Sequence, residues 1–510
     1  MTDDVSSPIA RMQQPDFYPH AVTAKIQLVQ THASWVVLTG DYAYKIKKSV
    51  NYGFLDYSTL EKRKHFLNEE LRLNLKIAPQ LYLEVLPISR EGRDFILGSS
   101  KNIVEYALKM RQFAPDSLLS NLLKAEKLEA KHFIELGKIV AKFHKNALTN
   151  QYISGFGAID RIKVAFSENY RQSQKYLGIV QTDKQFEATK AYSDRFFDRR
   201  QDLFADRIGQ NKIKECHGDL HLKNICLWQG KIQLFDRIEF NESFRFVDTM
   251  YDVAFTVMDL EAREKPKFAN AFLNSYLEHS QDWQGLCILP LYLCRQAYVR
   301  AKVNSFLLDD LQIPESDRKK AQQAAIKYYR QAYQYTKSRT GSLIIMSGLS
   351  GSGKSTVART IARAKSAIQI RSDAVRKHLA EIPLDESGSD RIYTPEMTQK
   401  TYHRLEEVGI MLAKEGYTVI LDAKYDRFAW RQSCFARAKA EKIPYQIVHC
   451  TAPIAVLRDR LKRRKNDISD ATAELIAPQQ ANAEPFTPAE RPYVIMVDTS
   501  QTNWRHKAIL

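Results

Sequence analysis

The sequence lacks any apolar run long enough to cross a membrane. A spanning helix needs about 18 to 20 consecutive apolar residues, whereas the longest candidate, Leu286–Cys294, is about half that length and ends at Arg295. The first residues, Met1–Gln14, contain two aspartates and no apolar core, so they do not resemble a secretory signal. We therefore expect a cytoplasmic protein with no membrane partner.

Cysteine is also scarce, with six residues in 510. No pair has the C-x-x-C spacing, and none stands at a zinc-type distance from histidine, so neither a disulfide scaffold nor a zinc finger is expected. Free, buried thiols in a reducing compartment are the simplest interpretation. The six are Cys216, Cys226, Cys287, Cys294, Cys434 and Cys450.

Internal repeats and low-complexity tracts are absent as well. The content of 44% hydrophobic and 26% charged residues is that of an ordinary globular protein, and the length suggests about three folding units. The net charge of +17 is spread along the chain. Such a charge favours solubility and affinity for anions such as nucleotides, and nucleic-acid binding is the less favoured alternative.

The chain is expected to be multidomain, with a change of character near residues 308–341. A polar stretch predicts a linker helix at about 315–337, which ends in a loop at Gly341. From 341 to 510 strands alternate with helices, which predicts an α/β domain with a parallel sheet. The expected strands are Leu343–Met346, Ile368–Ile370, Thr418–Leu421, Tyr445–Cys450 and Tyr493–Val497, and the expected helices include Ser355–Ala364 and Pro395–Glu415.

The part before residue 341 has a different pattern, typical of an α+β fold with two lobes. After an N-terminal extension (1–19), a small lobe at about 20–105 contains short strands and one helix. A lobe at about 106–335 is mostly helical and is interrupted by loops and strands at 213–240. The small-lobe elements expected are the strands Trp35–Leu38, Tyr42–Lys47 and Leu81–Leu86 and the helix Leu60–Leu75.

A phosphate-binding loop is the firmest motif. Gly348-Leu-Ser-Gly-Ser-Gly-Lys354-Ser355 fits G-x-x-x-x-G-K-[ST], follows an apolar strand and opens a helix. Its backbone N–H groups and the helix N-terminus attract phosphate, the lysine reaches the β- and γ-phosphates, and the serine is a Mg²⁺ ligand. The expected binding residues for ATP or GTP are Gly348, Gly351, Ser352, Gly353, Lys354, Ser355 and Thr356.

Further residues extend this site. Asp422 ends an apolar strand and is a candidate Mg²⁺ ligand, although a turn-starting aspartate is the alternative. Asp373 could take the proton of a substrate hydroxyl, and Arg376 could hold an anionic substrate group; a helix cap with a surface arginine is the alternative. The basic run with Arg460, Arg463 and Arg464 is a candidate lid over the phosphates or a solvated basic face.

These motifs resemble those of the small P-loop kinases, the group of gluconate kinase, chloramphenicol phosphotransferase, zeta toxin and polynucleotide kinase. The resemblance covers about a third of the chain. It implies ATP-dependent phosphorylation of a hydroxyl without choosing the substrate.

A second phosphotransfer signature lies upstream. His217-Gly-Asp219-Leu-His-Leu-Lys-Asn224 has H-x-D-x-x-x-x-N spacing, and Asp236 follows an apolar stretch twelve residues later. Asp219 suits the catalytic base, Asn224 and Asp236 suit Mg²⁺ ligation, and His217 would buttress the loop. The motif resembles the aminoglycoside phosphotransferase group of the protein-kinase-like fold, which includes choline and fructosamine kinases.

That resemblance implies a phosphate-binding lysine on the strand Tyr42–Lys47. Lys45 is favoured over Lys47, and Glu70 is favoured over Glu69 as its ion-pair partner. The sequence departs from protein kinases in having no G-x-G-x-x-G loop and in having Asp236-Arg-Ile at the metal-binding tripeptide. Both departures argue against a protein kinase and leave open a domain that binds nucleotide without transfer.

The order of the two domains resembles bacterial bifunctional aminoglycoside phosphotransferase/ATP-binding proteins, as do Asn51-Tyr-Gly-Phe54-Leu-Asp56-Tyr and Glu239-Phe-Asn241. We therefore expect an ATP-dependent phosphotransferase with two nucleotide sites and small-molecule substrates. A nucleic-acid end kinase and a nucleotide-responsive regulator without transfer are the alternatives.

Overall fold

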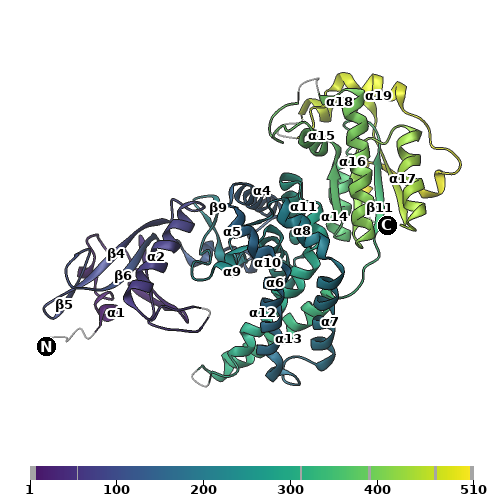
Figure 1. Cartoon of the computed structure of the whole chain (residues 1–510). Helices are drawn as coiled ribbons and strands as arrows, with labels where there is room; N and C mark the ends of the chain where they lie inside the picture. Colours follow the sequence, from purple (N-terminus) through teal and green to yellow (C-terminus); the bar gives the residue numbers. More distant parts are fainter. Residues whose placement is uncertain (1–6, 54, 311–312, 389–391, 464–467, 506–510) are drawn as a thin grey trace. The chain divides into compact units, whose positions relative to one another are not determined.

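The computed structural model of the chain describes residues 7–53, 55–310, 313–388, 392–463 and 468–505 (Figure 1). The chain forms two compact units. Unit 1 consists of Met1–Leu128, Asn146–Ala165 and Phe204–Asp259, and unit 2 consists of Glu129–Lys145, Phe166–Leu203 and Leu260–Leu510. The helical segment expected at 106–335 therefore contributes to both units, and its last helices belong to the same unit as the P-loop.

Unit 1 contains a six-stranded antiparallel sheet in the order β1-β2-β3-β6-β4-β5. Along β3, Tyr44 and Ile46 enter the apolar core, so the alternation of a strand turns Lys45 and Lys47 to the other face. Helix α2 (Leu60–Leu75) covers that face and is capped by Thr59. The strands are β1 (Gln27–Gln30), β2 (Ser34–Leu38), β3 (Tyr42–Lys47), β4 (Tyr82–Glu91), β5 (Asp94–Leu97) and β6 (Ile103–Arg111).

The remainder of unit 1 holds two short strand pairs and a loop between them. Strand β7 (Ile213–Glu215) pairs with β10 (Phe246–Asp248), and β8 (Ile225–Trp228) forms a hairpin with β9 (Lys231–Leu234). Helix α10 (Thr249–Ala262) starts directly after β10. The loop of the H-x-D-x-x-x-x-N motif joins β7 to β8, so the motif is held from both ends.

Unit 2 contains a five-stranded parallel sheet in the order β12-β13-β11-β14-β15. Ile344 and Met346 of β11 pack against α14 (Lys354–Lys365) on one face. On the other face α16 (Pro395–Lys414) approaches so closely that a Cβ on Gly409 would lie 2.9 Å from Leu421. The strands are β11 (Ser342–Ser347), β12 (Ile368–Arg371), β13 (Thr418–Asp422), β14 (Tyr445–Thr451) and β15 (Val494–Asp498).

The edge strand β12 is fastened to α11 (Pro266–Ser280) by carboxamide side chains. The Ala367 carbonyl accepts hydrogen bonds from Asn270 Nδ2 at 2.9 Å and Asn274 Nδ2 at 3.0 Å, and the Gln369 amide donates to Asn274 Oδ1 at 2.7 Å. Asn274 thus pairs with the strand edge as a neighbouring strand would. The other long helices of this part of the chain are α4 (Ala130–Asn146), α6 (Ile159–Ser173), α7 (Asp183–Arg199), α12 (Leu289–Phe306) and α13 (Glu315–Tyr335).

The predicted fold class is confirmed: a two-lobe kinase-like α+β part is followed by an α/β part with a parallel sheet. Every strand expected after residue 341 is present within two residues of its predicted ends, and the linker helix is α13. All six cysteines are free and buried. No helix within the described residues is long and apolar enough to cross a bilayer. The domain boundaries at 20, 335 and 341 stay predictions.

Candidate active sites

The P-loop wraps between β11 and α14 through glycines with left-handed φ. Gly348, Gly351 and Gly353 have φ of 132°, 81° and 85°, a region that costs energy for residues with a Cβ. A Cβ on Gly351 would lie 2.8 Å from the carbonyl oxygen of Leu457 in α18 (Ile454–Arg463). A side chain at position 351 therefore does not fit, both for its backbone angle and for lack of space.

Lys354 and Ser355 open helix α14, as predicted. The Lys354 ammonium donates to the Leu349 carbonyl at 2.8 Å, inside the loop. Burial lowers the pKa of Lys354, and the Asp422 carboxylate partly offsets this. A cation held by the helix N-terminus and surrounded by backbone N–H groups forms a site for phosphate.

Asp422 lies at the carboxyl end of β13, in register with Arg371 of β12. Gln369 donates from Nε2 to Asp422 Oδ2 at 2.8 Å and reaches towards the Ser355 carbonyl at 3.5 Å. The Asp422 carboxylate and the Ser355 hydroxyl are hard oxygen donors, which fit Mg²⁺. Sequence analysis missed Gln369, although a polar residue within an apolar strand was a usable signal.

Asp373 stands in the first turn of α15 (Ser372–Leu379), beside the same sheet edge. Burial raises the pKa of Asp373, while Arg371 and the Ser469 hydroxyl oppose the shift and Asp422 adds to it. A carboxyl group with a raised pKa near a phosphate site suits proton transfer. The alternative of a helix cap with a surface arginine is wrong, because the N-cap residue is Arg371, which makes no side-chain cap, and Arg376 is buried.

Arg376 is buried on the same helix. Its Nη1 donates to the Ile392 carbonyl at 3.1 Å and to the Thr398 hydroxyl at 3.2 Å, and its guanidinium lies 5.0 Å from the Tyr393 ring. Its Nε has no partner among the described residues. Part of the guanidinium therefore orders the segment before α16, and binding of an anionic group by Arg376 stays a prediction.

The basic run on α18 is not a uniform lid. Arg460 donates to the Gly351 carbonyl at 3.3 Å and to Thr499 Oγ1 at 2.8 Å, so it braces the P-loop. Arg463 is exposed and pairs with Asp459 at 2.8 Å. Arg464 lies outside the described residues, as does Phe54. Binding of phosphates by these arginines stays a prediction.

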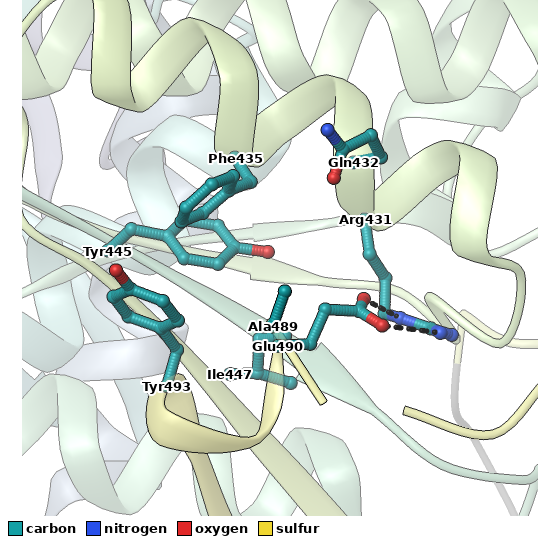
Figure 2. A pocket seen from close by; sticks show the side chains of 8 residues that line it. All are labelled: Arg431, Gln432, Phe435, Tyr445, Ile447, Ala489, Glu490 and Tyr493. Carbon is teal, nitrogen blue, oxygen red and sulfur yellow. Dashed lines mark hydrogen bonds and ion pairs between the residues drawn. The ribbon is translucent and has the colours of Figure 1, made fainter. Parts of the chain in front are cut away.

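A small cavity lies between the parallel sheet and α17 (Phe428–Ala440), and none of the predicted site residues lines it (Figure 2). Phe435, Tyr445 and Tyr493 line it, together with the ion pair between Arg431 and Glu490 at 2.6 Å. Its volume of about 20 Å³ holds about one water molecule. The cavity is therefore too small for a substrate.

Unit 1 has a separate site on the face of its sheet that α2 covers. The Lys45 ammonium donates to Glu70 Oε1 at 2.7 Å and to Asp236 Oδ1 at 2.8 Å. Although burial opposes its charge, Asp236 and Glu70 raise the pKa of Lys45. The structure thus brings together the favoured lysine, the favoured glutamate and a predicted metal ligand, whereas Glu69 pairs with Arg72.

The loop after β7 holds the predicted catalytic base. Asn224 Nδ2 donates to Asp219 Oδ2 at 3.1 Å, so the two predicted site residues are in contact. His217 Nε2 lies 2.9 Å from the Phe235 carbonyl, and its Nδ1 accepts from the Asp219 amide at 3.3 Å. The buttressing role predicted for His217 is therefore seen.

Asp252, on α10, was missed by sequence analysis. Its two carboxylate oxygens accept from the His217 amide at 2.7 Å and the Gly218 amide at 2.8 Å. It anchors the turn before Asp219 through backbone donors, which no spacing in the sequence reveals. Gly218 has φ of 86°, and a Cβ there would meet the Phe244 carbonyl at 2.4 Å.

Asp236 adopts a left-handed backbone with φ of 62°, which is costly outside glycine and recurs at functional sites. Its amide donates to the Tyr82 hydroxyl at 3.0 Å. Burial opposes its charge, but Lys45 outweighs this and lowers the pKa of Asp236. The next residue, Arg237, donates to the Leu73, Glu215 and Cys216 carbonyls and fixes the turn. Asp236 and Asn224 offer oxygen donors that fit Mg²⁺.

Comparison with known proteins gives one family match and two kinds of similar protein. Residues 343–486 match the AAA domain family AAA_33. Over 465 residues the chain is 29% identical to the uncharacterized protein Rv2004c of Mycobacterium tuberculosis and to the uncharacterized protein Mb2027c of Mycobacterium bovis, and 90% of each chain is covered.

Two solved structures are similar to different parts of the chain. A gluconokinase from Sinorhizobium meliloti is 22% identical, with coverage of 34% of this chain and 91% of its own and a TM-score of 0.25. A choline kinase from Cryptosporidium parvum is 11% identical, with coverage of 64% and 94% and a TM-score of 0.39.

Proposed function

We propose that the chain is an ATP-dependent phosphotransferase with two nucleotide sites, each acting on the hydroxyl group of a small molecule. The observation that supports the proposal is that each unit holds a group of side chains whose chemistry suits phosphate transfer. One is the Lys45, Glu70, Asp219, Asn224 and Asp236 set of unit 1, and the other is the Lys354, Ser355, Asp373 and Asp422 set of unit 2.

In unit 1, Asp219 accepts the proton of the acceptor hydroxyl as its oxygen bonds to the γ-phosphorus and the bond to the β-phosphate oxygen breaks. Lys45 holds phosphate oxygens, and Glu70 positions Lys45. Asn224 and Asp236 would hold Mg²⁺, which neutralises charge on the phosphates when bound. The hydrogen bond from Asn224 to Asp219 supports this division of roles, because it holds the proposed base next to the proposed metal ligand.

In unit 2, Lys354 and the P-loop amides hold the phosphates and Asp373 accepts the acceptor proton. Ser355 and Asp422 would hold Mg²⁺. Arg376, with a buried Nε that lacks a partner among the described residues, supports an acceptor that carries an anionic group. The domain order supports membership of the bifunctional kinase-like and P-loop group whose motifs the sequence resembles.

The test is a screen of a metabolite library, with oligonucleotides included, for transfer of the ATP γ-phosphate by the parent chain and by Asp219→Asn and Lys354→Ala. Each substitution is expected to abolish one activity, by about 10²-fold or more, and to spare the other. If one substitution removes all turnover, the two sites are not independent. ATP binding without transfer to any acceptor favours a regulator, and transfer only to oligonucleotide ends favours a nucleic-acid kinase.

A further inference from the structure

The unit 1 site contains a second lysine that the proposed reaction does not use. Lys47 is 2% exposed and lies two residues from Lys45 on the same face of β3. Its ammonium donates to Glu70 Oε2 at 2.9 Å, Glu239 Oε1 at 2.5 Å and the Tyr57 hydroxyl at 3.2 Å. The Tyr57 hydroxyl donates in turn to Glu239 Oε1 at 2.5 Å.

Glu70 is the residue that both lysines share. One of its oxygens accepts from Lys45 and the other from Lys47, and its side chain is fully buried. Lys47 thus holds the position of Glu70 independently of Lys45. When Lys45 directs its donors to a phosphate, the carboxylate that positions it stays fixed through its second oxygen.

Glu239 connects the same lysine to the Asp236 turn. It lies three residues after Asp236 and is 7% exposed. Hydrogen bonds among Lys47, Glu239 and Tyr57 therefore join β3, α2 and the Asp236 turn in one cluster. Buried charges leave such an arrangement only at high cost, because each lost partner strands a charge away from water.

The cluster also has an unbalanced charge on the side where a cation would bind. Two ammonium groups, of Lys45 and Lys47, face three carboxylates, of Glu70, Asp236 and Glu239. The excess is one negative charge. The Asp236 side chain is 43% exposed, whereas those of Glu70 and Glu239 are buried. The open carboxylate is the one that can accept a metal, and the buried ones are structural anchors.

We propose that Lys47, Glu239 and Tyr57 are positioning residues, which keep Glu70 and the Asp236 turn aligned so that Lys45 can bind the phosphates of a nucleotide. This inference rests on the proposed nucleotide site of unit 1. It implies that α2 and the Asp236 turn stay aligned without an activating signal, because the alignment is built into the buried core of the unit.

The experiment measures binding of Mg·ATP and of adenosine to the full chain by titration calorimetry, with Lys354→Ala present throughout to silence the P-loop. Glu239→Gln keeps the shape of the side chain and removes its charge. We expect it to weaken Mg·ATP binding about tenfold and to change adenosine binding by less than about twofold. Tyr57→Phe retains every charge and is expected to weaken Mg·ATP binding about threefold.

The matched control is Asp248→Asn, which neutralises another buried ion pair of unit 1, with Arg207 at 2.5 Å. It is expected to lower the melting temperature without changing the ratio of the two affinities. Lys45→Met separates the two proposals. If it leaves Mg·ATP binding unchanged, unit 1 has no nucleotide site at Lys45. If it weakens Mg·ATP selectively, but Glu239→Gln and Tyr57→Phe weaken both ligands equally or neither, the positioning role is wrong.

Discussion

At the scale of single residues, Asp373 combines a candidate catalytic role with an environment that disfavours its charge. Its pKa is raised by burial, so the carboxylate loses its charge at a higher pH than an ordinary aspartate, whose pKa is about 3.9. A base must be ionised, so transfer by the P-loop site should fall as pH drops through the raised pKa. Asp373→Asn should lower that activity about 10²- to 10⁴-fold. The measurement is the pH profile of kcat/KM for the parent chain and for the Asp373→Asn variant.

Asp373→Asn should raise the stability of the fold at neutral pH, although it lowers activity. A group with a raised folded pKa stabilises the fold below its ordinary pKa, and that contribution is lost as pH rises through the raised value. Near pH 7 the ionised carboxylate therefore costs stability, and Asp373→Asn should melt at a higher temperature than the parent chain. The gain should shrink in acid. A variant that is inactive and also less stable at pH 7 would indicate a structural residue instead.

The sequence predicted the residues whose chemistry is defined by a motif. Lys45 contacts Glu70 and Asp236 as expected, and His217 lies against the Phe235 carbonyl next to Asp236. The sequence did not predict Asp252, which supports the loop of His217 through backbone amides. Supporting contacts of this kind depend on how distant elements pack, and no local pattern records them.

At the scale of elements, strand β12 depends on α11. Asn274 accepts from the Gln369 amide and donates to the Ala367 carbonyl, and the Gln369 side chain holds Asp422. Asn274→Ala removes both strand contacts and leaves an amide unpaired. We expect unit 2 to lose about 1–2 kcal/mol of unfolding free energy, measured by urea denaturation, and to bind Mg·ATP more weakly because Asp422 loses its alignment.

A suitable control is Asn304→Ala on α12. Asn304 donates to the Arg300 carbonyl one turn earlier, just as Asn274 donates to the Asn270 carbonyl, and each of these bonds lies within a single helix. Its removal should cost less and leave Mg·ATP binding unchanged. Equal losses for the two variants would show that Asn274 acts only within α11.

Strands and helices with strong periodicity were predicted well, and the helix Leu60–Leu75 and the strand Tyr42–Lys47 have the predicted ends. Strand β6 was missed, although it is central in its sheet. From Glu105 on, charged residues interrupt its apolar ones, so the strand has no long apolar run, although Ala107 on one face and Leu108 on the other are buried. The edge strands β1 and β5 were also missed because they are short and have weak alternation.

At the scale of the whole molecule, linear domain boundaries and compact units differ. The sequence places a boundary at 335–341, where composition changes. In the structure, Leu260–Leu510 forms one unit with two earlier segments, because α11 packs on α14 and β12. Composition along the chain reports where a linker is, whereas the unit is set by which surfaces are buried together.

This arrangement predicts how fragments behave. A fragment of residues 338–510 retains the sheet and the P-loop but lacks α11, so the Ala367 carbonyl and the Gln369 amide lose their partners and an apolar part of α14 becomes exposed. A fragment of residues 264–510 keeps them. The shorter fragment should therefore melt at least about 5 °C below the longer one in differential scanning calorimetry, and Mg·ATP should bind it more weakly. Asn274→Ala in the longer fragment should lower its melting temperature part of the way towards that of the shorter fragment. Equal melting temperatures for the two fragments would mean that the P-loop part is an independent domain and that the α11 contacts add nothing to its stability.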